Sequence, residues 1–327
     1  MTAPGAAPAG LAPRFAGRLL ERDLRRGLVA HGYAFYGEPG LGQEEAAAAW
    51  AAALLCGAGG CGACRDCSMA AERAHPDLLW VTPDGASLRL AQAAEACAFV
   101  ARRPFQAGRR VVVIEGAERL TEEAGNRLLK ELEEPPAGAV FVLLASRPEA
   151  VPATIRSRLR PVVFRPWPAE AVREALRAEG VEERAARWAA ALSGGNPGRA
   201  RTYARDPEWR AAAEGVLELL PRVAAAGPAE AAQWAARLRD WQARGFEVLE
   251  WMDLALRDAL AARTGGRPRW CDEAAAAALA AALPPSAHET ARRALWEARA
   301  ALQANVNPLL TFEVLLIRLA RAGRVGA

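Results

Sequence analysis

The chain has 327 residues, of which 52% are hydrophobic, 24% charged and 6% aromatic, and its formal net charge is +4. At roughly 150 residues per domain, this length predicts two domains with room for a third, which excludes a single small module. The composition is that of a globular protein with a sizeable core, which excludes wholesale disorder. The positive charge is compatible with nucleic-acid binding but is equally common in other classes of protein.

No membrane span or secretion signal is predicted. The longest apolar runs, 46–56 and 274–283, are shorter than the roughly 18 residues that a membrane span needs. Residues 1–13 are mostly alanine, glycine and proline, with no basic region before a leucine-rich stretch. We therefore expect a cytoplasmic protein with a frayed N-terminus.

Residues 31–165 alternate short apolar runs with longer helical stretches, a pattern that predicts an α/β domain with a parallel sheet. Runs rich in β-branched or aromatic residues predict strands at Tyr33–Tyr36, Val111–Ile114 and Val140–Ala145, with weaker candidates at Leu78–Thr82 and Val162–Phe164. Good helix formers predict helices at Glu44–Leu55, Leu90–Arg102 and Glu122–Glu133.

After Pro166 and Pro168 the strand signals stop, and the remaining chain is predicted to be helical. Residues 169–206 predict a small helical subdomain that closes at the turn with sequence GGNP at 194–197. Beyond it, helices are predicted at Glu208–Leu220, Glu230–Arg244, Gly245–Arg263, Cys271–Leu283, His288–Ala304 and Pro308–Ala322.

A glycine-rich loop directly follows the first predicted strand. Its sequence, GEPGLGQE, gives Gly37, Gly40 and Gly42 the spacing of a P-loop, in which backbone N–H groups and a helix N-terminus hold a phosphate. A P-loop requires lysine and then serine or threonine after the last glycine, but Gln43 and Glu44 occupy these positions. Taken alone, the loop is equally well interpreted as a glycine turn without a ligand.

The strand Val111–Ile114 ends where a P-loop ATPase carries its Mg²⁺-binding acid and then its catalytic acid. Glu115 can fill the first role, but Gly116 cannot activate water. Phosphoryl transfer depends on positioning and charge neutralisation, so the combined loss of the lysine, the hydroxyl and the catalytic acid should abolish it. We predict an ATPase fold that has lost its own active site, binds ATP unproductively if at all and has no intrinsic ATPase activity.

Four cysteines lie close together in the sequence: Cys56, Cys61, Cys64 and Cys67. Such crowding in a chain without a secretion signal favours metal binding over disulfides. Four thiolates make a closed tetrahedral Zn²⁺ site, and the glycines between them permit tight turns. We predict a structural zinc ion, with free thiols or a redox pair as the alternatives.

Two arginines, Arg156 and Arg158, flank Ser157 beyond the third strong strand. Either both lie in solvent, which is the commonest position for arginine, or one is an arginine finger. An arginine finger reaches into a neighbouring subunit and stabilises charge on a transferring phosphoryl group. The residues alone leave both interpretations open.

In chain order, these segments resemble the clamp-loader subunits of bacterial DNA polymerase III. The resemblance is carried by His31–Gly37, the four-cysteine insert, His75–Asp77, Asn126–Pro136 and Thr154–Arg158. The run NRLLKELEEPP at Asn126–Pro136 is the most specific, and the NVNP at 305–308 is similar as well. The resemblance therefore covers nearly the whole chain.

The resemblance implies membership of a five-subunit AAA+ ring that opens a sliding clamp and places it on primed DNA. It implies gamma/tau and delta subunits, the clamp and, through the assembled ring, primed DNA as partners. It also implies an AAA+ domain with a zinc-binding insert at 1–165, a helical lid at 166–206 and an oligomerising helical collar at 207–327. The altered loop favours a non-motor subunit, which is an accessory of the polymerase.

The resemblance also assigns roles to single residues. It implies that Arg158, beside Ser157, is an arginine finger acting in trans. Arg199 is similar to the lid arginine that active members point at their own nucleotide, and beside an altered loop its role would be vestigial. The chain departs from the family at Leu159, where a cysteine is usual, and in the closer spacing of its first two cysteines.

Lys130 is the one lysine among 42 lysine and arginine residues, and it lies in the most family-like run. Chance explains it, or a compact ammonium is needed there to contact DNA phosphate or the acids of the adjoining strand.

Two other functions stay open at this stage. One is an ATP-hydrolysing motor subunit of the gamma/tau type, which hydrolysis by the purified chain would reveal. The other is a zinc-dependent nucleic-acid-binding protein outside any ring, which would bind DNA tightly by itself with a steep salt dependence.

Overall fold

The computed structural model describes residues 16–234, 244–271 and 273–324. The chain divides into two compact units: Met1–Trp167 with Asn196–Gly198, and Pro168–Gly195 with Arg199–Ala327. Among the described helices, none has the length and apolar character that crossing a membrane requires.

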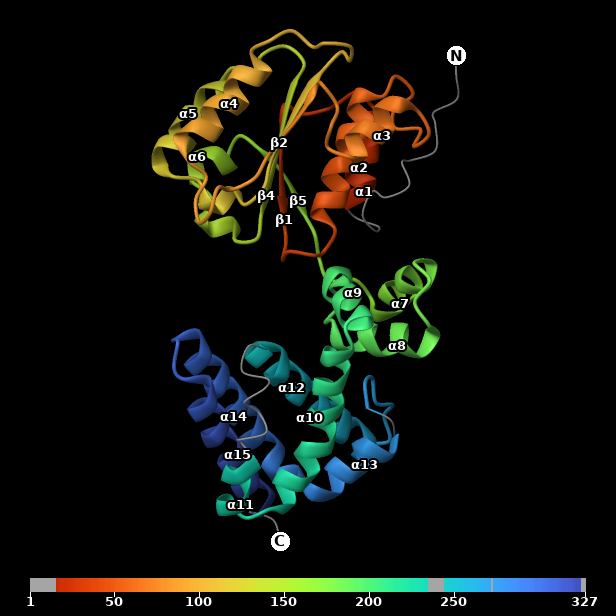
Figure 1. Ribbon diagram of the computed structural model, residues 1–327, viewed down its shortest axis with the longest axis vertical. Helices are drawn as coiled ribbons and strands as arrows, with labels where there is room; N and C mark the ends of the chain where they lie inside the picture. The colour runs from red at the N-terminus through yellow and green to blue at the C-terminus, as the bar shows by residue number, and fades with distance from the viewer. Residues whose placement is uncertain (1–15, 235–243, 272, 325–327) are drawn as a thin grey trace. The chain divides into compact units, whose positions relative to one another are not determined.

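The first unit is built on a five-stranded parallel sheet in the order β2-β3-β4-β1-β5 (Figure 1). The strands are β1 (Gly32–Tyr36), β2 (Leu78–Val81), β3 (Arg110–Ile114), β4 (Ala139–Ala145) and β5 (Arg160–Val163). The five predicted strands are confirmed to within two residues at each end. Tyr36 is in register with Ala145, and Ile114 with Leu143, so the carboxyl ends of β1, β3 and β4 meet at one edge of the sheet. Parallel α/β sheets bind their ligands at this edge.

Helices cover both faces of the sheet (Figure 1). One face carries α1 (Ala16–Arg25), α2 (Gln43–Leu55) and α3 (Arg65–Ala71), and the other carries α4 (Leu90–Val100), α5 (Glu122–Glu133) and α6 (Ala153–Arg156). Short 3₁₀ turns lie at Ala117–Arg119 and Pro148–Ala150. The predicted helices correspond to α2, α4 and α5, whereas α1, α3 and α6 were missed.

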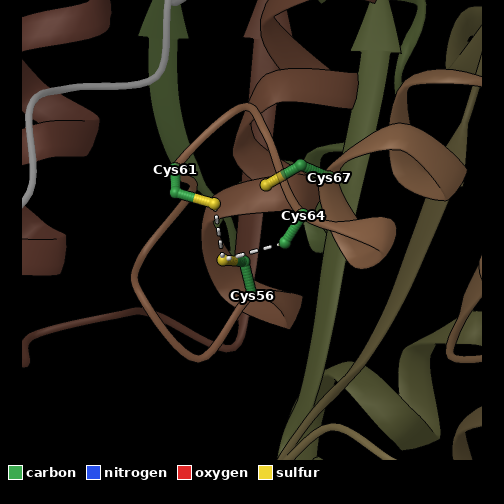
Figure 2. Close-up of side chains that lie close together, drawn as sticks. All are labelled: Cys56, Cys61, Cys64 and Cys67. Carbon is green, nitrogen blue, oxygen red and sulfur yellow. Dashed lines mark hydrogen bonds between the residues drawn. The ribbon is translucent and has the colours of Figure 1, made fainter.

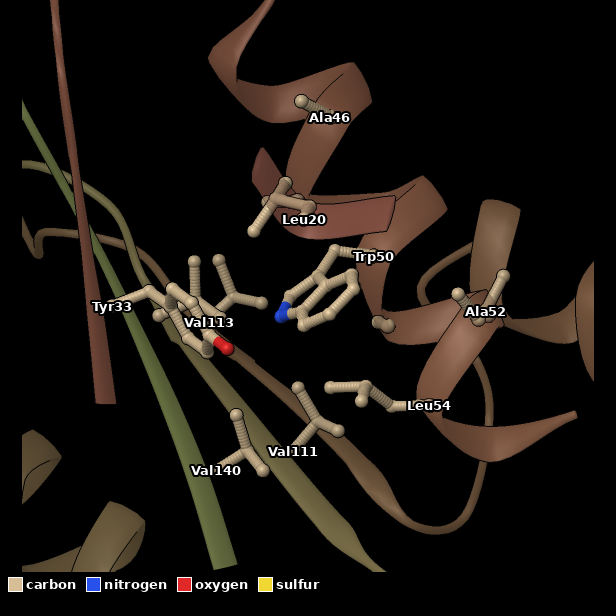
Figure 3. Packing of buried hydrophobic residues seen from close by; sticks show 14 of the residues in the cluster. Leu20, Tyr33, Ala46, Trp50, Ala52, Leu54, Val111, Val113 and Val140 are labelled. Carbon is tan, nitrogen blue, oxygen red and sulfur yellow. The ribbon is translucent and has the colours of Figure 1, made fainter. Parts of the chain in front are cut away.

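The core between the sheet and α1–α3 is centred on Trp50 (Figure 3). The rings of Trp50 and Tyr33 are fully buried and meet edge to face, with centroids 5.4 Å apart. Such a pair contributes about 0.5–1.5 kcal/mol of stability beyond that from the buried area of the two rings. The Tyr33 hydroxyl accepts the N–H of Ala30 at 2.9 Å and donates to Asp23 at 3.3 Å. These contacts fix the strand that leads into the glycine loop.

The second unit is helical, as predicted. Its helices are α7 (Ala169–Ala178), α8 (Glu183–Leu192), α9 (Pro197–Arg205, whose first two residues belong to the first unit), α10 (Pro207–Ala225), α11 (Pro228–Trp234), α12 (Gly245–Arg263), α13 (Glu273–Ala282), α14 (Pro285–Gln303) and α15 (Pro308–Arg324). The predicted helix Glu230–Arg244 lies partly outside the described residues. The rings of Tyr203, Trp209 and Trp251 join α9, α10 and α12, with centroids 5.0–5.8 Å apart. The predicted division into a lid and a collar stays a prediction.

Candidate functional site

A cavity of about 300 Å³ lies at the carboxyl edge of the sheet, between the glycine loop and the ends of β3 and β4. Its lining includes the predicted loop residues Gly37, Gly40 and Gln43, together with Glu115 and Gly116 from the end of β3. The charged side chains in the lining are Glu44, Glu45, Glu115, Glu118 and Arg119. Four carboxylates against one guanidinium make this cavity unfavourable for a polyphosphate.

The loop has the backbone of a phosphate-binding loop with a neutral side chain inside it. Gly40 (φ 90°) and Gly42 (φ 99°) adopt the left-handed conformation that favours glycine, and Gly42 caps α2. The buried Gln43 amide turns back and donates from Nε2 to the Glu38 carbonyl at 2.9 Å. A Cβ on Gly37 would lie 2.8 Å from this Nε2 atom. The amide therefore fills the inside of the loop, where a P-loop lysine would supply a positive charge.

The next two carbonyls of the loop are bound by the segment Asn196–Gly198 of the same unit. The Asn196 side chain donates to the Pro39 carbonyl at 2.9 Å, and the Gly198 N–H donates to the Gly40 carbonyl at 3.0 Å. A Cβ on Gly198 would lie 2.8 Å from the Gly40 Cα. Asn196, in the predicted turn, and Gly198, just after it, thus brace the glycine loop.

Three of the acids at the cavity have donors from elsewhere in the protein. Arg73 donates to Glu44 at 2.8 Å and to Glu115 at 3.0 Å. Trp80 Nε1 donates to the same Glu115 oxygen at 2.5 Å. Sequence reasoning missed Arg73 and Trp80, because no local pattern links them to residues some 30 to 40 positions away.

The third of these acids, Glu118, joins the ends of β3 and β4. Ser146 donates to Glu118 from its hydroxyl at 2.5 Å and from its N–H at 3.4 Å. Because the serine hydroxyl is neutral, Glu118 keeps its negative charge at the cavity wall.

Arg158 is fixed in place just beyond α6. Its Nη1 donates to the Thr154 carbonyl at 2.7 Å and to Ser157 Oγ at 3.2 Å, while its Nη2 pairs with Glu133 of α5. Ser157 Oγ also donates to the Thr154 carbonyl at 3.0 Å. About a third of the Arg158 side chain is exposed (33%), whereas Arg156 is an exposed residue. Arg158 is therefore the arginine whose guanidinium is positioned by contacts within the protein.

Lys130 and Arg199 are two further predicted site residues. Lys130 is exposed on the last turn of α5. Arg199, in the second unit, pairs with Glu250 and donates from Nε to the Tyr203 hydroxyl at 3.2 Å. The Arg199–Glu250 pair ties α9 to α12, so in this arrangement Arg199 serves the packing of the second unit.

The four cysteine side chains converge at the ends of α2 and α3 (Figure 2). Their Sγ atoms lie within 4.8 Å of one another, with 3.8 Å between Cys56 and Cys61 and 3.5 Å between Cys56 and Cys64. A tetrahedral zinc ion with bonds of about 2.3 Å to sulfur separates its ligands by about 3.8 Å. The cluster therefore fits zinc in both chemistry and spacing.

Backbone donors lower the pKa of two of the four cysteine thiols, whereas burial raises the pKa of Cys67 to about 12. Burial acts to raise the pKa of Cys56, but the N–H groups of Cys61, Gly60 and Ala58 outweigh it and lower the pKa to about 6. Backbone N–H groups, that of Ala63 first, also lower the pKa of Cys61. Such donors stabilise negative charge on sulfur, which a metal-bound thiolate carries.

The His75–Asp77 segment is a structural anchor beside the cluster. Asp77 is fully buried and accepts the N–H groups of Phe105, Gln106 and Ala107 at 2.6–2.9 Å. Burial acts to raise the pKa of Asp77, but these three donors outweigh it and lower the pKa. His75 Nδ1 accepts the Asp77 N–H at 3.0 Å, so the histidine helps to fix this segment.

The fold and the cavity together define a class. The first unit is a parallel α/β domain whose glycine loop has the spacing of a P-loop, with glutamine and glutamate in place of the lysine and hydroxyl residues. Residues 13–168 match the family described as DNA polymerase III, delta subunit.

Individual relatives are similar over part of the chain. The chain is 36% identical over 215 residues to the DNA polymerase III subunit delta′ of Pseudomonas aeruginosa, a match that covers 61% of this chain and 64% of that protein. It is 30% identical over 205 residues to the delta′ subunit of Bacillus subtilis, covering 62% of each. It is 34% identical over 160 residues to the gamma/tau subunit of Mycobacterium tuberculosis, covering 47% of this chain and 27% of that protein. The matches span less than two thirds of the length of these relatives.

Proposed function

We propose that the chain is a delta′-type, non-motor subunit of the DNA polymerase III clamp loader in the cytoplasm. In this role it helps a ring of gamma/tau and delta subunits to place the sliding clamp on primed DNA. The family match over residues 13–168 and the relatives named delta′ support the proposal. The predicted lid and collar would supply the remaining ring contacts.

The observation that carries the non-motor assignment is the altered cavity. A triphosphate needs cations around it, yet the loop holds a neutral Gln43 amide and Glu44 stands in the first turn of α2. Gly116 offers no base at the end of β3. The chain therefore has no intrinsic ATPase activity and acts as an accessory of the polymerase.

Arg158 is the residue through which such a subunit governs ATP hydrolysis by its neighbour. Its guanidinium contacts Glu133, Ser157 and the Thr154 carbonyl, and these contacts position it just beyond α6 with a third of the side chain exposed. A positioned guanidinium stabilises the charge of the transferring phosphoryl group.

The four cysteines hold one structural zinc ion. Zinc bound there offers no open coordination position for chemistry, because all four ligands come from the protein. Its contribution is to the folding of the loop between α2 and α3.

A reconstituted clamp loader tests the arginine finger. Arg158→Ala should leave folding and ring assembly intact while strongly depressing clamp-stimulated ATPase activity and loading at limiting ATP. An arginine finger is worth about 10³ to 10⁵ in rate where isolated, and several sites in one ring dilute this effect. Arg156→Ala is the matched control and should do less. Equal loading by the Arg158→Ala ring and the parent ring would refute the assignment.

Lys130 is proposed as a contact to DNA phosphate, since its ammonium is exposed on α5. Lys130→Arg keeps the charge but not the compact shape, and we expect it to load clamps less well than the parent protein. Equal loading would show that the lone lysine has no special role.

A further inference from the structure

Helices α2 and α3 form a hairpin that is closed at both of its ends. At one end, Cys56 caps the C-terminus of α2 while Cys64 and Cys67 lie at the start of α3. At the other end, Arg73 follows α3 and contacts Glu44 in the first turn of α2. The cysteine cluster and the altered cavity are therefore opposite ends of one structural element.

Arg73 joins this hairpin to the sheet. Its Nη2 lies 2.8 Å from Glu44 Oε2 and its Nη1 lies 3.0 Å from Glu115 Oε1, so one guanidinium bridges acids from α2 and from the end of β3. The guanidinium carbon lies 3.9 Å from the ring centroid of Trp80, whose Nε1 also donates to Glu115. The planar fork suits this double contact, and a single ammonium would not reproduce it.

The backbone of Arg73 is held in a conformation that arginine rarely adopts. Its φ is 58°, and among the described residues only Asn305 shares a positive φ without being glycine. The N–H of Arg73 donates to the Ala70 carbonyl and that of Ala74 to the Met69 carbonyl, a helix ending in which glycine is the favoured residue. Strain kept at one residue indicates that its side chain is needed in that place.

The charge balance explains what Arg73 does there. Glu44, Glu115 and Glu118 face the same cavity, and a P-loop domain would meet such charge with Mg²⁺ and a lysine. Here the lysine position is Gln43, so the positive charge at Glu44 and Glu115 comes from Arg73 instead.

We propose that Arg73 is the built-in counter-cation of the altered cavity and that metal binding by the four cysteines keeps it in place. The metal fixes the start of α3, α3 presents Arg73, and Arg73 clamps the start of α2 to the end of β3. Loss of the metal loosens α3, frees both acids and opens the cavity to cations. This inference rests on the zinc ion proposed for the four cysteines and is independent of the clamp-loader role, because it concerns contacts within one unit of the chain.

Hydrogen exchange on the full chain tests whether the metal holds Arg73 in place and, through Arg73, the start of α2 and the end of β3. Stripping the metal with a chelator should speed exchange several-fold at the start of α2 and at residues 110–118, besides the cysteine loop itself. Arg73→Gly, which also relieves the backbone strain, should produce the same increase while one zinc ion per chain is retained. Arg65→Ala removes an exposed arginine from the same helix and should leave both regions as in the parent protein. If stripping the metal changed exchange only at residues 56–72, the proposed link between the metal and Arg73 would be refuted.

Terbium binding tests the counter-cation. Tb³⁺ prefers carboxylate oxygens, and Trp80 lies against Glu115 as a sensitiser of its emission. Arg73→Gly should bind Tb³⁺ about tenfold more tightly than the parent protein, since two carboxylates lose their partner. Adding Glu115→Gln to Arg73→Gly should abolish the gain. Equal Tb³⁺ affinity of parent and Arg73→Gly, or a gain that survives Glu115→Gln, would refute the role of Arg73.

Discussion

Gly198 donates its N–H to the carbonyl of Gly40 at 3.0 Å, and the two backbones approach so closely that neither residue has room for a side chain. A Cβ on Gly198 would lie 2.8 Å from the Gly40 Cα, and a Cβ on Gly40 would lie 2.6 Å from Asn196 Oδ1. The glycine loop is thus braced by a segment more than 150 positions away in the chain.

Gly198→Ala should push this contact apart. Overpacking at a backbone contact typically costs about 1–3 kcal/mol of the unfolding free energy, and denaturant unfolding monitored by tryptophan fluorescence measures it. Gly108→Ala is the control, because a Cβ there would meet nothing within 4 Å. If both variants were as stable as the parent, the brace would have no energetic importance.

Restoring the missing P-loop residues should restore nucleotide binding. The Gln43→Lys, Glu44→Thr double variant replaces an amide and a carboxylate with the ammonium and hydroxyl that phosphate and Mg²⁺ require. Calorimetry should detect Mg-ADP binding to this variant and none to the parent chain. Glu45→Thr, a change one position further along the first turn of α2, should not restore binding. Comparable binding by the parent chain would contradict the interpretation of the cavity.

The cysteine cluster should bind one zinc ion per chain, measured by elemental analysis of protein purified without oxygen. Cys61→Ser removes an exposed ligand and should lower both zinc content and thermal stability. Cys97→Ser alters a buried thiol outside the cluster and should leave the zinc content unchanged. Absence of zinc from the anaerobic parent protein would remove the assignment.

Asp77 should make stability depend on pH. Its folded pKa is lowered, so its contribution is complete above the usual aspartate pKa of about 3.9 and is lost as the pH falls through the folded value. Asp77→Asn leaves buried N–H groups poorly satisfied and should cost about 1–3 kcal/mol near neutral pH. The difference in unfolding free energy between parent and variant should shrink below about pH 4. A difference that stays constant down to pH 2 would contradict this role.

Local patterns in the sequence determined most of the architecture. Continuous apolar runs such as Val111–Ile114 and Val140–Ala145 became buried strands, because a strand enclosed on both faces needs apolar residues throughout. The spacing of the glycines and of the four cysteines likewise indicated the loop and the cluster. Each of these signals lies within a few residues, so it is visible in the sequence itself.

Only the tertiary structure decided how these parts are connected. Arg73 meets Glu115 and Gly198 meets Gly40 because the sheet and helices bring distant residues together, and no periodicity connects such pairs. Arg199 likewise pairs with Glu250 in the second unit, a contact that the similarity of its motif could not reveal. Side-chain partners depend on distances of a few ångströms set by packing, whereas strands and loops depend on the residue types along the chain.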